Sequence, residues 1–198
     1  MGSEPFARLP ELQFPFGTAI QEDGTTFVTE TKYHRIRVFG ADGETRAVFG
    51  SRGTGAGCFE SPRGLCIVGR DMVAVADSGN ARVQLLRAET GQPVRYVSGG
   101  QLYRPWDVAW VPEIERVFVA DLAKNCVKVF TLKGEVVGTV ELDNVGEPLF
   151  DKPCRVEYHP LTGNIHIADR QSARVHAICP KRFIHLATRE LRPGATPW

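Results

Sequence analysis

The chain has 198 residues, with 24 Lys and Arg against 23 Asp and Glu, so its net charge is +1. This length allows one domain with a sizeable core, and the near-neutral charge argues against a DNA-binding protein that depends on an overall positive charge. The 20 Gly and 13 Pro make up a sixth of the residues, which disfavours a helical bundle because helix interiors exclude both.

The sequence also favours a cytoplasmic location. It has no apolar stretch of the ~18 to 20 residues that cross a bilayer, and residues 1–15 lack the apolar centre of a secretion signal. The five cysteines include no Cys-x-x-Cys pair, and their odd number is typical of reduced thiols. We therefore expect a cytoplasmic protein that does not associate with a membrane.

Short segments rich in Val, Ile and Phe are predicted as strands, because apolar residues in them alternate with polar ones or run in short blocks. In chain order these segments are 15–17, 27–30, 33–38 and 45–49; 62–68, 72–77, 82–85 and 93–97; 105–109, 117–121, 125–129 and 135–140; and 153–156, 165–169, 173–176 and 183–186. The strands thus fall into four groups of four, with no predicted helix between them.

Turn chemistry separates the strands within each group. Gly43, Gly91 and Gly134 stand at the bend between the third and fourth strands. Between the second and third strands of the second group, Gly79 and Asn80 are expected to take positive φ angles, with the preceding aspartate accepting hydrogen bonds from the turn amides.

The four groups are copies of one repeat. A proline opens each copy, at 15, 62, 105 and 153, so that the copies are 47, 43 and 48 residues apart. Two further kinds of marker keep the register of Pro15, Pro62, Pro105 and Pro153. They are the acidic residues Glu30, Asp77, Asp121 and Asp169 and the arginines Arg35, Arg82 and Arg174. A four-stranded unit of 40 to 50 residues that repeats in this way is typical of a β-propeller blade. The predicted fold class is all-β, a β-propeller-like array of four blades, each a four-stranded antiparallel sheet.

The second copy carries the residues that identify a family. Its frame Phe59-x-x-Pro62-x-Gly64, followed by Val75-Ala-Asp-Ser-Gly-Asn-x-Arg-Val83, resembles the NHL repeat. The resemblance covers about residues 12 to 186. It implies a propeller, commonly of six blades, of the kind found at the C-terminus of many tripartite-motif ubiquitin ligases.

The copies depart from this pattern in places, and their number is lower than six. The first has Glu30 for the aspartate, and the third has Cys126 for the arginine. The fourth has no turn glycine, because residues 179–182 at that bend are Cys-Pro-Lys-Arg. We expect an N-terminal extension at 1–11, a propeller domain at 12–187 with blades at 12–57, 58–101, 102–147 and 148–187, and a tail at 188–198. Four blades either close into a ring or form an open partial propeller, whose exposed sheet edges would favour a homodimer.

The arginines of the repeat follow the acidic marker by five positions, across a hairpin. We expect each to pair with its own acidic residue; the alternative is a ring of phosphate contacts. Residues 50–57 are rich in glycine but lack the Gly-Lys-Ser/Thr of a phosphate-binding loop, so they are interpreted as a flexible linker between blades.

The inner strand of each blade is expected to begin at its proline, because at the first residue of a strand the absence of an N–H removes no hydrogen bond from the sheet. Gly17 and Gly64, two residues further on, allow neighbouring blades to approach closely. Asp107 and Arg155 occupy this position in the other copies, and we expect them to form an ion pair.

No cofactor, metal or catalytic residue is predicted. The last copy gathers Cys154, His159, His166, His176, Cys179 and His185, but without the spacing of a zinc site. No Ser-His-Asp grouping or Gly-x-Ser-x-Gly is visible either. A propeller lyase or hydrolase, including a metal-dependent lyase, therefore remains only the second alternative for the function.

The loops at the proline side of the blades carry basic and aromatic residues together. The predicted binding face comprises Lys32, Tyr33, Arg52, Arg63, Tyr103, Arg104, Trp106, Lys124, Lys152, Arg155 and Arg170. Tyr, Trp and Arg dominate binding hot spots, so we predict a non-catalytic module that binds a partner protein and, by the resemblance, recruits substrates for ubiquitination. Single-stranded RNA is the first alternative, because bases stack on aromatic rings and phosphates meet cations.

Overall fold

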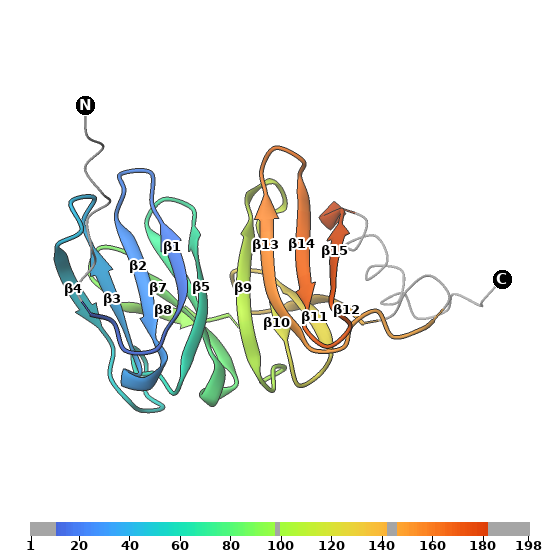
Figure 1. Ribbon diagram of the computed structural model, residues 1–198, viewed down its shortest axis with the longest axis horizontal. Helices are drawn as coiled ribbons and strands as arrows, with labels where there is room; N and C mark the ends of the chain where they lie inside the picture. Colours follow the sequence, from blue (N-terminus) through green and yellow to red (C-terminus); the bar gives the residue numbers. More distant parts are fainter. Residues whose placement is uncertain (1–10, 98–99, 142–145, 182–198) are drawn as a thin grey trace.

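In the computed structural model, which describes residues 11–97, 100–141 and 146–181, the chain forms four small antiparallel sheets that follow one another along the sequence (Figure 1). The first sheet has the strands β1 (Pro15–Ile20), β2 (Thr26–Glu30), β3 (Arg35–Phe39) and β4 (Thr45–Phe49). The second has β5 (Pro62–Val68), β6 (Met72–Asp77), β7 (Arg82–Arg87) and β8 (Pro93–Tyr96). The third has β9 (Pro105–Val111), β10 (Arg116–Asp121), β11 (Cys126–Phe130) and β12 (Val136–Val140), and the fourth β13 (Pro153–His159), β14 (Asn164–Asp169) and β15 (Arg174–Ile178).

Each sheet is one blade of a β-propeller, with its strands in sequence order. The inner strands β1, β5, β9 and β13 begin at the four repeat prolines, which confirms that prediction. The glycines at 43, 91 and 134 have φ angles of 81°, 68° and 91°, as the third-to-fourth-strand turns require. The predicted strand at 183–186 and the tail at 188–198 lie outside the described residues.

Helical structure in the described ranges consists of the single 3-10 turns η1 (Thr31–Tyr33), η2 (Ser78–Asn80) and η3 (Pro112–Ile114) and of two helical residues, Pro180 and Lys181, after β15. None of these has the length or apolar character needed to cross a lipid bilayer.

Apolar side chains pack into three core clusters, one at each interface between consecutive blades. The clusters include Phe27 with Leu86 between the first and second blades, Leu85 with Phe130 between the second and third, and Phe118 with Ile167 between the third and fourth. Leu85 and Leu86 serve different interfaces because successive side chains of a strand point to opposite faces. Full burial of a side chain of this size contributes roughly 1.5–3 kcal/mol, so packing between blades is the main stabilising interaction.

The four blades are arranged around a common axis, but within the described ranges the inner strand of the fourth blade does not pack closely on that of the first. The inner strands contact one another in the order β1–β5, β5–β9 and β9–β13, whereas β13 and β1 do not pack together in this way within the described ranges. Figure 1 shows the same separation between β1 and β13. Among the described residues, β1 and β13 thus lack the close contact that a closed ring would have, which favours the open partial propeller of the two predicted arrangements.

Candidate functional site

The buried acidic residue of each blade fixes the end of the blade at which the inner strand begins. We call this the proline end; in Figure 1 it is the lower end, where β2 and β14 finish. Each acidic side chain accepts a hydrogen bond from the N–H two residues before the proline: Gln13 to Glu30 (2.8 Å), Glu60 to Asp77 (2.7 Å), Tyr103 to Asp121 (2.7 Å) and Asp151 to Asp169 (2.7 Å). The carboxylate thus accepts a hydrogen bond from the segment that leads into its own blade, whereas we expected it to accept from the turn amides. It holds that segment against the proline end in all four copies.

The turn that follows the acidic residue differs from the prediction. Neither Gly79 nor Asn80 has a positive φ; the left-handed residue is Ala81, with φ 53°. His34, Asn125 and Ala173 take the same conformation at the equivalent positions. Gly79 is required for a different reason, because its N–H donates to the Glu60 carbonyl at 2.7 Å and a Cβ would lie 2.7 Å from that oxygen.

The repeat arginines pair with the acidic residue in two blades. Arg35 Nε lies 2.6 Å from Glu30 Oε2, and Arg82 Nε lies 2.8 Å from Asp77 Oδ2, as predicted. In the fourth blade the prediction is wrong: Arg174 is exposed. Asp169 instead accepts from Ser172 Oγ at 2.7 Å, with His176 Nε2 at 3.8 Å.

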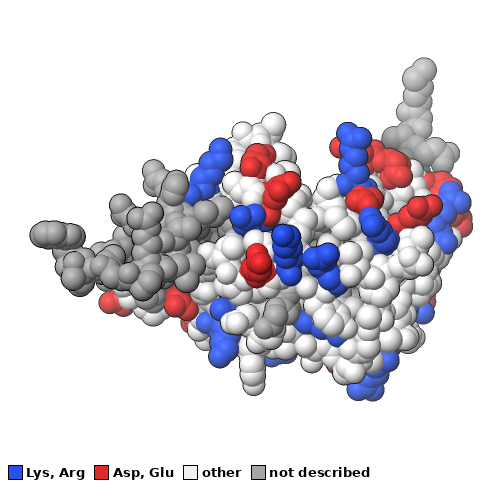
Figure 2. Space-filling view, turned by 180° about the vertical axis from the view of Figure 1, so that it is seen from behind, with Lys and Arg blue, Asp and Glu red and all other residues white. Residues whose placement is uncertain are grey.

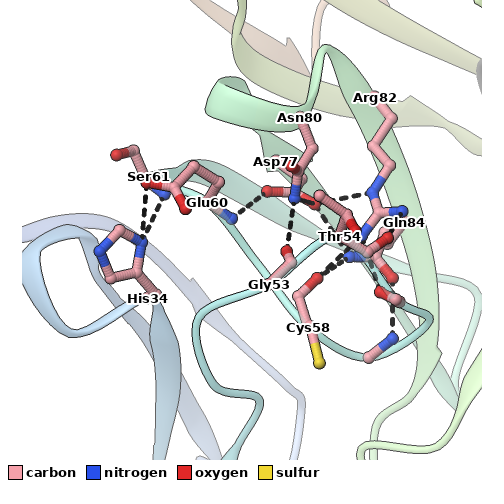
Figure 3. Close-up of polar contacts among 12 residues, drawn as sticks. His34, Gly53, Thr54, Cys58, Glu60, Ser61, Asp77, Asn80, Arg82 and Gln84 are labelled. Atoms are coloured by element: carbon pink, nitrogen blue, oxygen red, sulfur yellow. Dashed lines mark hydrogen bonds and ion pairs between the residues drawn. The ribbon is translucent and has the colours of Figure 1, made fainter.

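Arg82 also fastens the glycine-rich segment 50–57, which the sequence suggested was a flexible linker (Figure 3). Its guanidinium donates to the carbonyls of Thr54 (2.6 Å), Gly55 (2.8 Å) and Cys58 (2.9 Å). Asn80 Nδ2 donates to the Gly53 carbonyl at 2.9 Å. These carbonyls face a cation, whereas a phosphate-binding loop presents N–H groups, so this part of the segment has a structural role.

The positions two residues after the prolines meet near the axis, as predicted. A Cβ on Gly17 would lie 2.6 Å from the Arg63 carbonyl, and one on Gly64 would lie 1.7 Å from Asp107 Oδ1. Asp107 Oδ2 accepts from the Val156 N–H at 3.0 Å and lies 3.8 Å from Arg155 Nε. The predicted ion pair is present, and Asp107 contacts the inner strands of both neighbouring blades.

Burial raises the pKa of the Asp107 carboxyl to about 6, although the charge of Arg155 and the N–H of Val156 oppose this shift. The proton is therefore held more tightly in the folded chain than in the unfolded chain, where the pKa is about 3.9. As the pH rises from about 4 to about 6, this residue lowers the free energy of unfolding, by up to about 3 kcal/mol. Above that range its destabilising effect is complete, and below it the effect is absent.

Asp107→Asn is expected to remove this pH dependence. The free energy of unfolding of the variant, minus that of the natural chain, should rise by up to about 3 kcal/mol between pH 4 and pH 7, as measured by urea unfolding in a series of buffers. A difference that does not change with pH would show that Asp107 titrates normally.

Arginine and aromatic side chains of the first three blades form a cluster at the proline end. The Arg63 guanidinium lies 3.4 Å from the ring centroid of Trp106 and 4.9 Å from that of Phe16. Phe16 and Trp106 meet edge to face at 5.8 Å, and Arg104 lies 5.0 Å from the Trp106 ring. Contacts of this kind contribute roughly 0.5–2 kcal/mol each. We call these four residues, Phe16, Arg63, Arg104 and Trp106, the arginine–aromatic cluster.

Exposed aromatic residues at the same end also lie beside cations. Tyr103 is 67% exposed, with Lys124 5.6 Å from its ring, and Phe14 is 67% exposed, with Lys32 at 5.4 Å. Tyr33 is 47% exposed.

Several of the remaining residues of the predicted face make contacts within the chain. Arg52 Nε lies 3.0 Å from Glu60 Oε2 and lowers the pKa of that carboxyl. The Arg170 N–H donates to the Lys152 carbonyl at 3.1 Å, so these two residues lie together beside the fourth blade. All the predicted residues lie at the proline end, but only Arg63, Arg104 and Trp106 form a continuous cluster. Sequence reasoning missed Phe14 and Phe16, although their positions on either side of Pro15 were a usable signal.

The histidines and cysteines of the last blade are dispersed. The rings of His159 and His166 are 5.7 Å apart, and His176 packs edge to face on Phe150 at 5.1 Å. In the part of the chain that the structure describes, no three His, Cys, Asp or Glu residues are grouped as metal ligands; His185 lies outside that part.

Neither a known protein family nor a curated protein sequence matches the chain, but solved structures resemble its fold. A nidogen/laminin complex contains a chain with TM-score 0.72 and 19% identity, over 89% of this chain and 62% of that one. The hydrazine synthase of Kuenenia stuttgartiensis gives 0.66 and 15% over 94% and 51%, and a streptogramin B lyase gives 0.55 and 13% over 82% and 53%.

This chain therefore covers less than two thirds of each neighbour, and the neighbours include both a protein–protein complex and enzymes. At these identities the likeness concerns the fold alone. It agrees with the four-bladed arrangement of the sheets: the chain has the fold of a β-propeller.

Proposed function

We propose that the chain is a non-catalytic recognition module of the NHL type, which binds a partner protein through the proline end of its blades. The observation that carries this proposal is the set of aromatic residues at that end, of which Phe14 and Tyr103 are each 67% exposed. Large exposed aromatic side chains beside arginine and lysine are typical of binding hot spots. The nidogen/laminin neighbour is a chain of this fold within a protein–protein complex, which supports the proposal at the level of the fold.

A partner protein suits this surface better than single-stranded RNA does. A base that stacks on an aromatic ring needs a free ring face, but Arg63 and Arg104 both lie over Trp106, and Arg35 lies 4.8 Å from the Tyr33 ring. Figure 2, which views the molecule from behind and has the proline end at its lower edge, shows basic and acidic side chains interspersed on that side. RNA binding is therefore the outcome that the experiment below must exclude.

The proposal extends to the cellular setting. All five cysteines are free thiols, which supports a reducing, cytoplasmic location. Recruitment of substrates for ubiquitination would follow if this propeller belongs to a longer protein that carries the ligase, as the NHL-like frame around Asp77 suggests.

Affinity capture from a cell lysate tests the proposal. The natural chain is expected to retain a specific protein, and the variant with Phe14→Ser and Tyr103→Ser to lose most of it, because the two exposed rings contribute most of the contact area. Leu161→Ser is the control, since Leu161 is 92% exposed but lies in the β13–β14 loop at the other end of the blade. Equal capture by all three chains, or capture that ribonuclease abolishes, would contradict the proposal.

The open side of the propeller supports a second copy of the chain as a further partner. Val175 is 71% exposed on the outer face of the fourth blade, and Ile20 and Val48 are 66% and 50% exposed on that of the first. We expect concentration-dependent dimers in sedimentation velocity, and Val175→Glu should weaken them at least tenfold because it buries a charge in the contact. A monomer throughout the concentration series would rule out this association.

A further inference from the structure

Most arginines at the proline end are already paired with a carboxylate. Arg35, Arg52, Arg82 and Arg155 lie within 4 Å of Glu30, Glu60, Asp77 and Asp107, respectively. Among the described residues, Arg63 and Arg104 have no such partner, although they carry the two guanidinium groups of the arginine–aromatic cluster. Their charges are therefore the uncompensated ones at the centre of the proposed binding face.

Arg63 is also incompletely hydrogen-bonded. Its Nε is buried and has no hydrogen-bond partner within the described part of the chain, and a buried donor without a partner is costly. Burial, together with the like charge of Arg104, lowers its pKa to about 10. Both effects indicate a guanidinium whose environment lacks a nearby anion.

The surroundings of the two arginines are apolar as well as cationic. Phe16 and Trp106 flank Arg63, and the exposed ring of Tyr103 precedes Arg104 in the chain. A carboxylate that approached this cluster would therefore lie beside aromatic surface that could contact an apolar residue of the same segment. Hydrogen bonds between ionised groups in such partly desolvated surroundings are among the strong ones.

We propose that the arginine–aromatic cluster binds an acidic segment of the partner protein, in which a Glu or Asp carboxylate lies against Arg63 and Arg104 and a neighbouring apolar side chain packs on the exposed rings. This inference rests on the proposed function and specifies the chemistry of the partner at the same site. The partner supplies the anion that the other arginines of the proline end receive from this chain itself.

Fluorescence anisotropy with two labelled dodecapeptides tests the inference. One contains three repeats of Glu-Phe-Glu-Gly and the other three repeats of Gln-Phe-Gln-Gly, so that they differ only in charge. The acidic peptide is expected to bind at least tenfold more tightly, and its affinity should fall as salt is added. Equal affinity for the two peptides would overturn the inference.

Charge-removing variants locate the binding. Arg63→Gln and Arg104→Gln are each expected to weaken the acidic peptide about tenfold and to leave the neutral peptide unchanged. Arg46→Gln is the matched control, because Arg46 pairs with Asp42 on the exposed edge of the first blade. Arg104 is exposed, so its variant is informative even if Arg63→Gln disturbs folding. Undiminished binding by Arg104→Gln would contradict the assignment.

The same variants separate this inference from the proposed function. If the captured protein is lost by the Phe14 and Tyr103 double variant but retained by Arg63→Gln and Arg104→Gln, the face binds a protein and the acidic contact is wrong. If the double variant also retains it, both proposals fail. Tighter binding of a twelve-nucleotide oligouridylate than of the acidic peptide would overturn the inference in favour of RNA.

Discussion

Asp77→Ala is expected to lower the free energy of unfolding by about 3–5 kcal/mol, as for other buried ion pairs that lose one partner. The carboxylate is fully buried, and it accepts from the Glu60 N–H and from the side chains of Asn80, Arg82 and Gln84. All four donors would lose this acceptor, and the Arg82 guanidinium would keep its charge with no anion beside it.

Urea unfolding of Asp77→Ala and Asp42→Ala provides the comparison. Asp42 also pairs with an arginine, Arg46, but on an exposed surface, where such pairs contribute only about 0–1 kcal/mol. Similar losses in the two variants would show that the buried network does not have the structural role assigned to it. Loss of protection of the 50–57 segment against proteolysis in Asp77→Ala would support that role.

Gly64→Ala is expected to cost about 3 kcal/mol or more, at the upper end of the range for overpacking. The added Cβ would lie 1.7 Å from Asp107 Oδ1 and 2.7 Å from the Asp107 Cα, and the Cα belongs to backbone that can yield only if the blades separate. Gly163→Ala is the control: its φ of 67° is strained for alanine but nothing lies within 4 Å, so only about 1–2 kcal/mol should be lost.

A double variant tests whether the clash with Asp107 causes the loss. Asp107→Gly in the Gly64→Ala background should restore part of the stability, because it removes the carboxylate while the backbone at position 107 still crowds the added methyl group. The expected result is a cost well below the sum of the two single changes. An additive double variant would place the cause elsewhere.

The repeat made much of the fold predictable from the sequence. Proline at the first residue of each inner strand and glycine at the outer hairpins act locally, and the strands begin and turn where these residues stand, at Pro15 and Gly43 for example. The close approach of Gly64 to the next blade was also predictable, since the absence of a side chain there in two copies indicates lack of space.

Two of the errors concern interactions between segments far apart in the chain. Asp77 accepts from the N–H of a residue 17 positions earlier, and the sequence around its own turn contains no sign of that partner. Similarly, the segment 50–57 looks flexible by composition, but Arg82 holds it from 27 or more residues away. Both interactions depend on the path of the segment before β5 along the β6–β7 hairpin.

The candidate site was predictable as a face but not as a cluster. The repeat register placed Arg63 and Trp106 at the same end of adjacent blades. Which guanidinium lies over which ring depends on the angle between the blades. Phe16, from the first blade, also contacts Arg63. Four residues from three copies meet there because only the assembled propeller brings the inner strands together.

Site-specific photo-cross-linking tests most directly whether the proline end binds a protein. A photoreactive phenylalanine is placed at Tyr103 in one chain and at Leu161 in another, both highly exposed and at opposite ends of the blades. We expect a ribonuclease-resistant cross-link to a protein from position 103 and none from position 161. A protein cross-link only from position 161, or only an RNA cross-link from position 103, would contradict it.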